Sequence, residues 1–163
     1  MSRVLIVYYS RSGNTKKMAE LIKSGVEKEK VEVILKDVNS AKVGDLLEAD
    51  AIIMGSPVYY GSMAAPLKQL LDDSVVNHGD LDGKIGGAFS SSANIAGGNE
   101  TTILDILNAM LIHCMIIQGD PQGDHYGPVS IGKPEQRAEK ECVRFGQRIA
   151  KLTKKVTAES RKF

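Results

Sequence analysis

Hydrophobic positions along this chain alternate between short continuous runs and stripes with a spacing of three and four residues. Residues 4–9 form a continuous apolar run, which is typical of a strand buried on both faces of a parallel sheet. The next stretch carries Met18, Leu21, Ile22 and Val26 on one helical face, opposite several lysines and glutamates. The alternation continues along the chain without a repeat or a low-complexity segment. The pattern therefore predicts strands that alternate with amphipathic helices.

The remaining elements follow from the same pattern. Strands are expected at residues 31–35, 51–54, 85–90 and 115–118, and helices near residues 43–47, 66–71, 103–111 and 134–156. Pro66 and Pro134 fit the first turn of a helix, because an amide hydrogen at that position has no helical partner. Parallel strands need crossover connections. Five strands separated by helices thus predict an α/β fold, with an open, doubly wound, five-stranded parallel sheet in a single domain over residues 1–163.

Composition narrows the class of protein. The chain has 163 residues, of which 42% are hydrophobic and 25% charged, as in an ordinary soluble domain that can bury a core without disulfides. Cys114 and Cys142 form no CxxC pair, so we expect a reducing, cytoplasmic location. Cys142 lies on the apolar stripe of the last predicted helix, so we expect it in the core. The longest apolar run, residues 109–117, is too short for a membrane span. A net charge of +1 gives no drive for binding nucleic acid.

Three loops follow the carboxyl ends of the predicted strands, where open α/β sheets bind their ligands. The first loop consists of Ser10, Arg11, Ser12, Gly13, Asn14 and Thr15. Unpaired amides at a helix start attract anions, and hydroxyl groups add uncharged donors, so this loop predicts a phosphate site. The alternative is a helix start capped by Asn14 or Ser12 with nothing bound. The absence of GxxxxGK[ST] and GxGxxG motifs excludes a P-loop hydrolase and disfavours a dinucleotide held in the Rossmann manner.

The second loop spans residues 55–61 and carries two aromatic rings. Its candidate binding residues are Pro57, Val58, Tyr59, Tyr60 and Gly61. Tyrosine rings can cover a planar ligand while their hydroxyl groups stay in water, and glycine lets the backbone approach it closely. The alternative is a tyrosine-containing turn that only packs on the sheet edge.

The third loop spans residues 90–99 and is rich in small polar residues. Its candidate binding residues are Ser91, Ser92, Ala93, Asn94, Gly97 and Gly98. Oriented donors of this kind would favour the negative charge that a flavin gains along its pyrimidine edge on reduction. The alternative is a flexible Ser/Gly linker.

The histidines give weaker evidence for a functional site than the three loops do. His113 ends the helix predicted at residues 103–111, and we expect it close to the carboxyl ends of the strands or at a subunit contact. A helix C-terminus also stabilises an imidazolium, so a purely structural role is the alternative. His78 and His125 lack neighbouring cysteines or carboxylates in a metal-site pattern, and we predict no metal.

Taken together, the three loops resemble those of the flavodoxin-like superfamily, and within it the tryptophan-repressor-binding-protein type of NAD(P)H:quinone oxidoreductase. The resemblance covers nearly the whole chain and is strongest at residues 4–10 with Gly13, 55–57 with 61–64, 97–98 with 100–101, and at His113 and Met115. It implies strand order 2-1-3-4-5 and bound FMN. The FMN phosphate would lie on residues 10–15, the ring edge against 57–61, the pyrimidine end near 91–98, and the substrate side near His113.

The chain also departs from that type of oxidoreductase. Its connection after the second strand is shorter, it has no tryptophan, and Tyr59 replaces a basic residue often found in the second loop. We predict an FMN-dependent oxidoreductase that passes electrons from NAD(P)H to a quinone or a similar acceptor. His113 would orient the substrate or supply a proton, and the protein would form a dimer or tetramer. The alternatives are a flavodoxin-type electron carrier, although carriers tend to be acidic, and a flavin-binding domain without turnover.

Overall fold

Five parallel strands form the centre of the computed structural model, which describes residues 2–160. The strands lie in the order β2-β1-β3-β4-β5, as the resemblance implied. They are β1 (Arg3–Tyr8), β2 (Glu32–Asp37), β3 (Ala51–Pro57), β4 (Ile85–Ser92) and β5 (Ile116–Ile117). All paired neighbours run parallel, so their carboxyl ends meet at one edge of the sheet. The predicted doubly wound α/β fold is confirmed.

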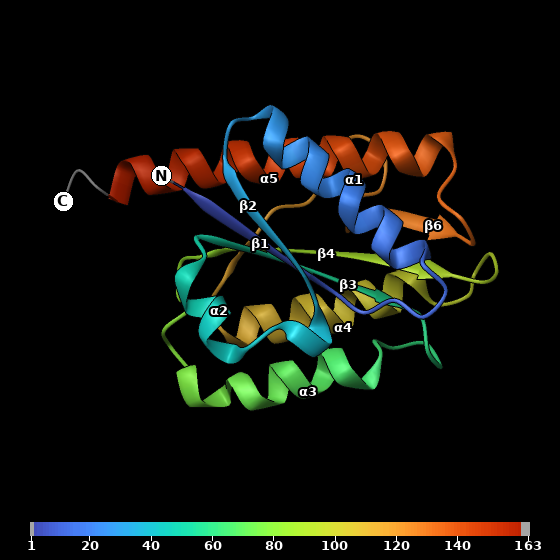
Figure 1. Ribbon diagram of the computed structural model, residues 1–163, viewed down its shortest axis with the longest axis horizontal. Helices are drawn as coiled ribbons and strands as arrows, with labels where there is room; N and C mark the ends of the chain where they lie inside the picture. Colours follow the sequence, from blue (N-terminus) through green and yellow to red (C-terminus); the bar gives the residue numbers. More distant parts are fainter. Residues whose placement is uncertain (1, 161–163) are drawn as a thin grey trace.

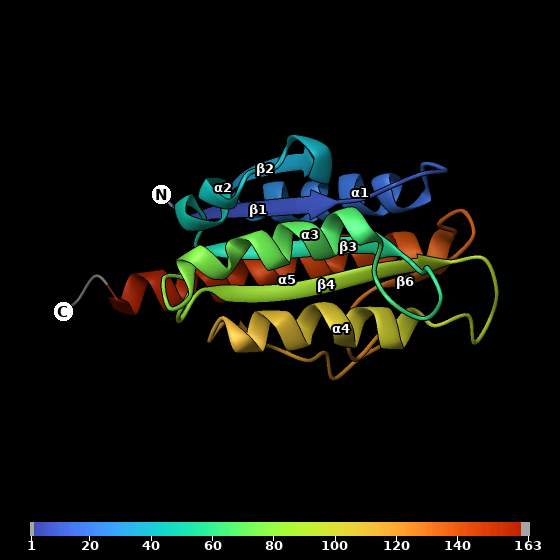
Figure 2. The same ribbon diagram turned by 90° about the horizontal axis from the view of Figure 1, so that it is seen from below.

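Helices cover both faces of this sheet (Figure 1). One face carries α1 (Asn14–Lys28) and α5 (Gln136–Ser160), and the other carries α2 (Val43–Glu48), α3 (Ala65–Asp73) and α4 (Asn99–Ile112). Two short 3-10 helices, η1 (Val38–Ser40) and η2 (Ser74–Asn77), follow β2 and α3. Figure 2, which is seen from below, shows α3 and α4 on the near side of the strands. None of the helices within residues 2–160 is long and apolar enough to cross a membrane.

The continuous apolar strands supply two cores, because successive side chains point to opposite faces. In β1, Val4 and Ile6 pack towards α1 and α5, whereas Leu5 and Val7 pack towards α3 and α4. Cys142 lies fully buried in the first of these cores, and burial raises the pKa of its thiol to about 12. Its predicted role as a core residue is confirmed.

Helices α1 and α5 approach each other unusually closely at two glycines. A Cβ atom added to Gly25 of α1 would lie 2.1 Å from the carbonyl oxygen of Val143, and one added to Gly146 of α5 would lie 2.1 Å from that of Ile22. These distances leave no room for a methyl group. The two helices therefore pack backbone against backbone over the sheet.

The edge position beside β4 is divided between two short strands, which the sequence did not predict. β5 pairs with Ile85 and Gly86, and a further strand, β6 (Val129–Ile131), pairs in parallel with residues 90–92. The strand expected at residues 115–118 is thus shorter, and residues 118–128 form a loop before β6. A three-residue strand has too few positions to show a periodic pattern.

Strands β3 and β4 extend further than predicted, to Pro57 and Ser92. Ser90, Ser91 and Ser92 are buried and belong to the ladder rather than to a loop. Their backbone groups pair with β3 on one side and β6 on the other, which outweighs the low strand propensity of serine. The predicted third loop therefore begins after Ser92.

Candidate functional site

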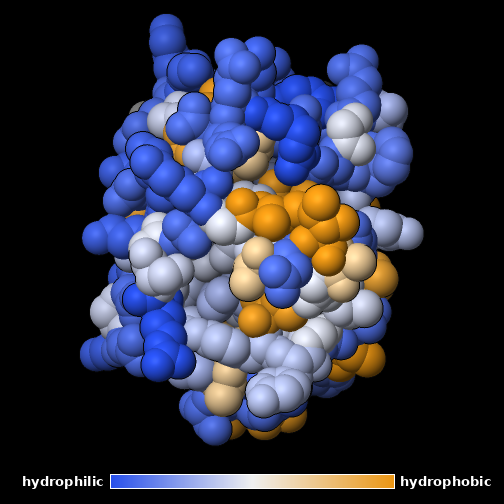
Figure 3. Space-filling view, turned by 90° about the vertical axis from the view of Figure 1, so that its right-hand side faces the viewer, coloured by the Kyte–Doolittle hydropathy of each residue, from blue (hydrophilic) through white to orange (hydrophobic). Residues whose placement is uncertain are grey.

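A cavity of about 680 Å³ opens at the carboxyl ends of the strands and unites the three predicted loops. Its lining residues are Arg11, Ser12, Asn14, Pro57, Val58, Tyr59, Ser91, Ser92, Ala93 and Gly132. Figure 3 views the molecule from this end and shows apolar side chains gathered near its centre. Ile131, which precedes the lining residue Gly132, and Ile95, two residues after Ala93, are exposed. The site is therefore a polar cavity with apolar residues close by.

The first loop presents hydrogen-bond donors at the start of α1. The hydroxyl oxygen of Ser10 accepts hydrogen bonds from the amides of Gly13 and Lys16, each at 3.2 Å, so its own hydrogen is free to donate. Gly13 is the N-cap residue, with φ 93°, and has no side chain to cap the helix, so the Ser10 hydroxyl accepts the Lys16 amide of the first turn instead. The alternative of a helix capped by Asn14 or Ser12 is therefore wrong, because the capping position falls on Gly13.

Free backbone amides complete the donor set of this loop. Among the described residues, no acceptor pairs with the amides of Ser12, Asn14 or Thr15. The Arg11 side chain, which lines the cavity, forms no ion pair with a described residue. Unpaired amides, a free hydroxyl hydrogen and one guanidinium group together suit a phosphate group. The hydroxyl of Thr15 instead pairs with that of Ser91 at 2.9 Å, and this buried contact ties α1 to β4.

The second loop is a tight hairpin. Tyr59 and Ser62 exchange backbone hydrogen bonds of 2.9 and 3.1 Å, and the two residues between them, Tyr60 and Gly61, have φ values of 50° and 79°. Two positive φ values are characteristic of a type I′ turn. Tyr60 is fully exposed at the tip, so of the two tyrosines Tyr59 lines the cavity. The Tyr59 ring meets Tyr9 edge-on, with centroids 6.1 Å apart, and this contact fixes its orientation.

The third loop is closed by hydrogen bonds between residues 92 and 99. Ser92 donates its hydroxyl hydrogen to the carbonyl of Asn94 at 2.8 Å and accepts a hydrogen bond from the side chain of Asn99 at 2.9 Å. The amide of Gly97 donates to the same Asn94 carbonyl at 3.1 Å. The Ser92 hydroxyl is therefore already committed. Backbone amides beyond it are the better candidates for contacting a ligand.

The second and third loops touch at two glycines. A Cβ atom added to Gly98, which has φ 104°, would lie 3.0 Å from Cα of Gly61. The hydroxyl of Thr101 donates to the carbonyl of Gly61 at 2.6 Å and holds the hairpin against the start of α4. Gly61, Gly97 and Gly98 thus shape the backbone around the cavity. None of these glycines lines the cavity.

Gly132 is the lining residue that the sequence analysis missed. Its amide donates to the carbonyl of Ser92 at 2.7 Å, at the end of β6. The signal was the three-residue stretch Val129-Ser130-Ile131 between Pro128 and Gly132, which is too short to distinguish from a loop. Its place at the cavity follows from the pairing of β6 with β4.

His113 lies at the opposite end of the sheet, so its expected position near the carboxyl ends of the strands is wrong. Helix α4 runs antiparallel to the strands and ends beside the start of β4, where the Cys114 carbonyl accepts a hydrogen bond from the Gly83 amide at 3.1 Å. The same chain therefore cannot bring this histidine to the cavity. A catalytic role through a subunit contact stays a prediction.

The environment of His113 favours a neutral ring. Ser74 donates its hydroxyl hydrogen to the carbonyl of Leu71, so His113 Nε2 must donate to the Ser74 oxygen at 2.8 Å. Nδ1 is buried without a partner among the described residues. Burial, with a smaller contribution from His78, lowers the pKa of His113. A proton on Nδ1 would have no acceptor there.

Acid is therefore expected to destabilise the fold through His113. In the unfolded chain His113 binds a proton at about pH 6.5, whereas in the folded chain it does so only at lower pH. The free energy of unfolding should fall as the pH drops below about 6.5 and level off below the folded pKa. His113→Gln keeps a donor for Ser74 and should lose this part of the pH dependence of the free energy of unfolding. Urea unfolding at several pH values measures both proteins, and identical pH profiles would contradict this assignment.

No group of three His, Cys, Asp or Glu side chains within residues 2–160 is arranged to hold a metal ion. The donors at the cavity are amides, hydroxyl groups, a carboxamide and a guanidinium group. Such a set suits a phosphorylated organic cofactor rather than a cation.

Comparison with known proteins identifies the family. A flavodoxin domain model matches residues 5–108. A protein named flavodoxin from Aquifex aeolicus is 42% identical over 159 residues, covering 92% of this chain and 86% of the relative. A protein named NAD(P)H dehydrogenase (quinone) from Archaeoglobus fulgidus is 30% identical over 190 residues, covering 96% of this chain and 100% of the relative.

A solved structure supports the same assignment. The structure described as a flavodoxin from the domain Archaea superposes with a TM-score of 0.78 and 34% identity, covering 93% of this chain and 99% of that chain. The predicted resemblance to the flavodoxin-like superfamily is confirmed, and relatives named as quinone dehydrogenases support the predicted type. The chain therefore belongs to the flavodoxin domain family.

Proposed function

We propose that this protein binds FMN in the cavity at the carboxyl ends of the strands and uses it to transfer electrons. The observation that carries the proposal is that one cavity joins a phosphate-type donor set at α1, the ring of Tyr59 and the backbone beyond Ser92. These are the three features that a phosphorylated planar cofactor needs. Family membership supports the same cofactor.

Each part of the cavity would then contact a different part of FMN. Ser10, Ser12 and the α1 amides would hold the phosphate, and the hairpin at residues 57–61 would lie against the ring edge. The backbone beyond Ser92 would face the pyrimidine end, where amide donors favour growing negative charge. Bound FMN supplies reversible acceptance of one or two electrons. No side chain has to act as a nucleophile.

The first candidate for the flow of electrons is transfer from NAD(P)H to a quinone or a similar acceptor. Relatives named NAD(P)H dehydrogenase (quinone) support it, and the chain lacks the acidic net charge that suits a carrier for basic partners. Within one chain, His113 lies away from the cavity. A proton needed by the acceptor would then come from water or from a second copy.

The second candidate is a carrier that shuttles single electrons between larger proteins. The relative named flavodoxin is 42% identical and aligns over 159 residues, close to the length of this chain. Alignment with the quinone dehydrogenase extends over 190 residues, so that relative contains segments that this chain lacks.

Removing the Ser10 hydroxyl is expected to test the phosphate site. Ser10→Ala loses the acceptor for the Gly13 and Lys16 amides and one free donor. We expect FMN affinity to fall about tenfold, with riboflavin affinity almost unchanged, because riboflavin lacks the phosphate. Fluorescence titration of the protein with both compounds measures this. Ser40→Ala removes an exposed hydroxyl bonded to the Asp37 carbonyl and serves as the control. An equal loss for both compounds would place the phosphate elsewhere.

Steady-state kinetics and a reductive titration distinguish the two candidates. Rapid NAD(P)H oxidation that depends on added benzoquinone supports the oxidoreductase. Two well-separated one-electron reduction steps, without NAD(P)H oxidation, support the carrier. If the protein binds neither FMN nor riboflavin, both candidate functions are wrong.

The predicted dimer or tetramer also remains a proposal, which sedimentation of the purified protein would test.

A further inference from the structure

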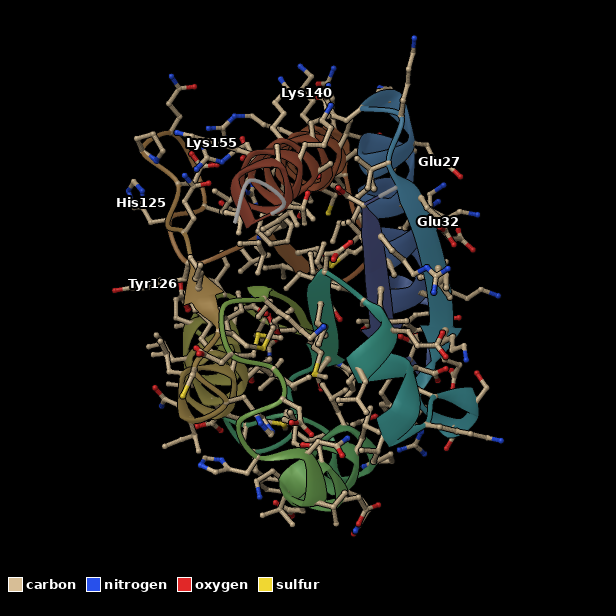
Figure 4. The ribbon with its side chains drawn as sticks, turned by 90° about the vertical axis from the view of Figure 1, so that its left-hand side faces the viewer. Glu27, Glu32, His125, Tyr126, Lys140 and Lys155 are labelled. Atoms are coloured by element: carbon tan, nitrogen blue, oxygen red, sulfur yellow. The ribbon has the colours of Figure 1, made fainter. Side chains whose placement is uncertain are left out.

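Three arginines of α5 hold the loop at residues 118–128 that separates β5 from β6. Arg144 pairs with Asp120 and donates to the Gln122 carbonyl at 2.6 Å, and Arg148 lies 3.3 Å from the same aspartate. Figure 4 shows His125 and Tyr126 of this loop pointing into solvent. The aspartates instead turn towards α5. Ion pairs thus fasten this loop to the helix.

The third arginine forms a different contact, at the start of β6. Arg137 Nη1 donates to Oδ1 of Asp124 at 2.6 Å, and Nη2 donates to the carbonyl of Val129 at 2.8 Å. Oδ2 of Asp124 accepts the amide of Val129 at 2.9 Å. One ion pair therefore fixes both the amide and the carbonyl of Val129, the first residue of β6.

The turn that leads into β6 is packed tightly against β4. The amide of Gly127 donates to the Asp124 carbonyl at 3.1 Å, and a Cβ atom added to Gly127 would lie 2.1 Å from the carbonyl oxygen of Ala88. Residues 124–127 therefore cannot shift towards the sheet. With Val129 also held, the pairing of Val129 with Ser90 has one available register.

Strand β6 carries this restraint to the cavity. Its last residues lead to Gly132, whose amide donates to the Ser92 carbonyl at 2.7 Å. Ser92 and Gly132 both line the cavity, and Asn99 bonds the Ser92 hydroxyl from α4. The wall formed by Ser92 and Gly132 thus depends on where β6 begins.

We propose that Asp124 and Arg137 are positioning residues for the flavin site, because they set the position of the Ser92–Gly132 wall through β6. This inference rests on the proposed function, in which that wall faces the flavin ring. Neither side chain lines the cavity. Their effect is expected at the ring end of the cofactor, because neither side chain bonds the loop at residues 10–15 that would hold the phosphate.

Asp124→Ala is the test, and Asp120→Ala is the matched control. Both substitutions remove an aspartate of the same loop that pairs with α5 arginines, but Asp120 forms no bond to the described residues of β6. We expect Asp124→Ala to weaken the binding of FMN and of riboflavin by the same factor, about tenfold, and to shift the flavin midpoint potential. Asp120→Ala should leave both affinities and the potential unchanged. Equal affinities and potentials in the two variants would overturn the proposal.

Hydrogen exchange of the protein without flavin gives an independent readout. The amide of Gly132, bonded to Ser92, should exchange about tenfold faster in Asp124→Ala than in Asp120→Ala. Asp124→Asn keeps an oxygen acceptor for the Val129 amide and should recover most of the protection. Equal Gly132 exchange in all variants would overturn the proposal even if flavin binds. Should the unaltered protein bind no flavin, the proposed function fails and hydrogen exchange alone decides the positioning role.

Discussion

Gly146→Ala is expected to lower the free energy of unfolding by about 3 kcal/mol or more. The new methyl carbon would lie 2.1 Å from the carbonyl oxygen of Ile22, and a backbone oxygen cannot rotate away as a side chain can. Helices α1 and α5 would have to separate, which would open the core beneath them. Alanine is more stable than glycine inside a helix by about 1 kcal/mol, which opposes this loss. The steric overlap is larger and therefore decides the sign of the change in the free energy of unfolding.

Gly44→Ala is the matched control for this substitution. Gly44 lies in helix α2, and a Cβ atom there would meet nothing within 4 Å. We expect this variant to be as stable as the unaltered protein or more stable by up to about 1 kcal/mol. Urea unfolding followed by circular dichroism measures all three proteins. If Gly146→Ala behaves like Gly44→Ala, the close approach of α1 and α5 is wrong.

Gly98→Ala is expected to reduce FMN affinity by about tenfold or more. Its Cβ atom would lie 3.0 Å from Cα of Gly61 and 3.1 Å from Cγ1 of Val58. A φ of 104° is also costly for alanine. The hairpin would have to move away from the third loop, which would displace Tyr59 from the cavity wall.

Gly83→Ala is the control that distinguishes the effect of backbone strain from the effect of moving the hairpin. Gly83 has φ 73°, and a Cβ atom there would have open space around it. Since it lies beside Cys114, at the far end of the sheet, it should cost stability without changing FMN affinity. Fluorescence titration gives the affinities and thermal unfolding gives the stabilities. An unchanged affinity in Gly98→Ala would mean that the two loops do not depend on each other.

The central strands could be predicted because they are apolar on both faces. Residues 4–9 and 51–54 carry their strand signal in a few consecutive side chains, and parallel pairing then fixes where their ends lie. The cavity could be predicted for the same reason. Once the strands are placed, residues 10–15 and 55–61 must meet at one edge of the sheet, whatever the loops look like in detail.

Elements held by long-range contacts could not be predicted from local pattern. Ser90, Ser91 and Ser92 form a strand because β3 and β6 surround them, although serine is typical of loops. The position of β6 depends on Asp124 and Arg137, which are 13 residues apart. The position of His113, by contrast, follows from the predicted topology. A helix that connects two parallel strands runs antiparallel to them, so the end of α4 lies at the amino ends of the strands.

The division of the outer sheet position between β5 and β6 has a consequence for behaviour at high protein concentration. An uninterrupted border strand offers a row of free amide and carbonyl groups, on which another molecule can add a strand and begin to aggregate. Here the border strands are two and three residues long. The loop between them carries charged side chains held by α5. This flank of the molecule is therefore a poor template for strand addition, and self-association through β-structure should begin elsewhere.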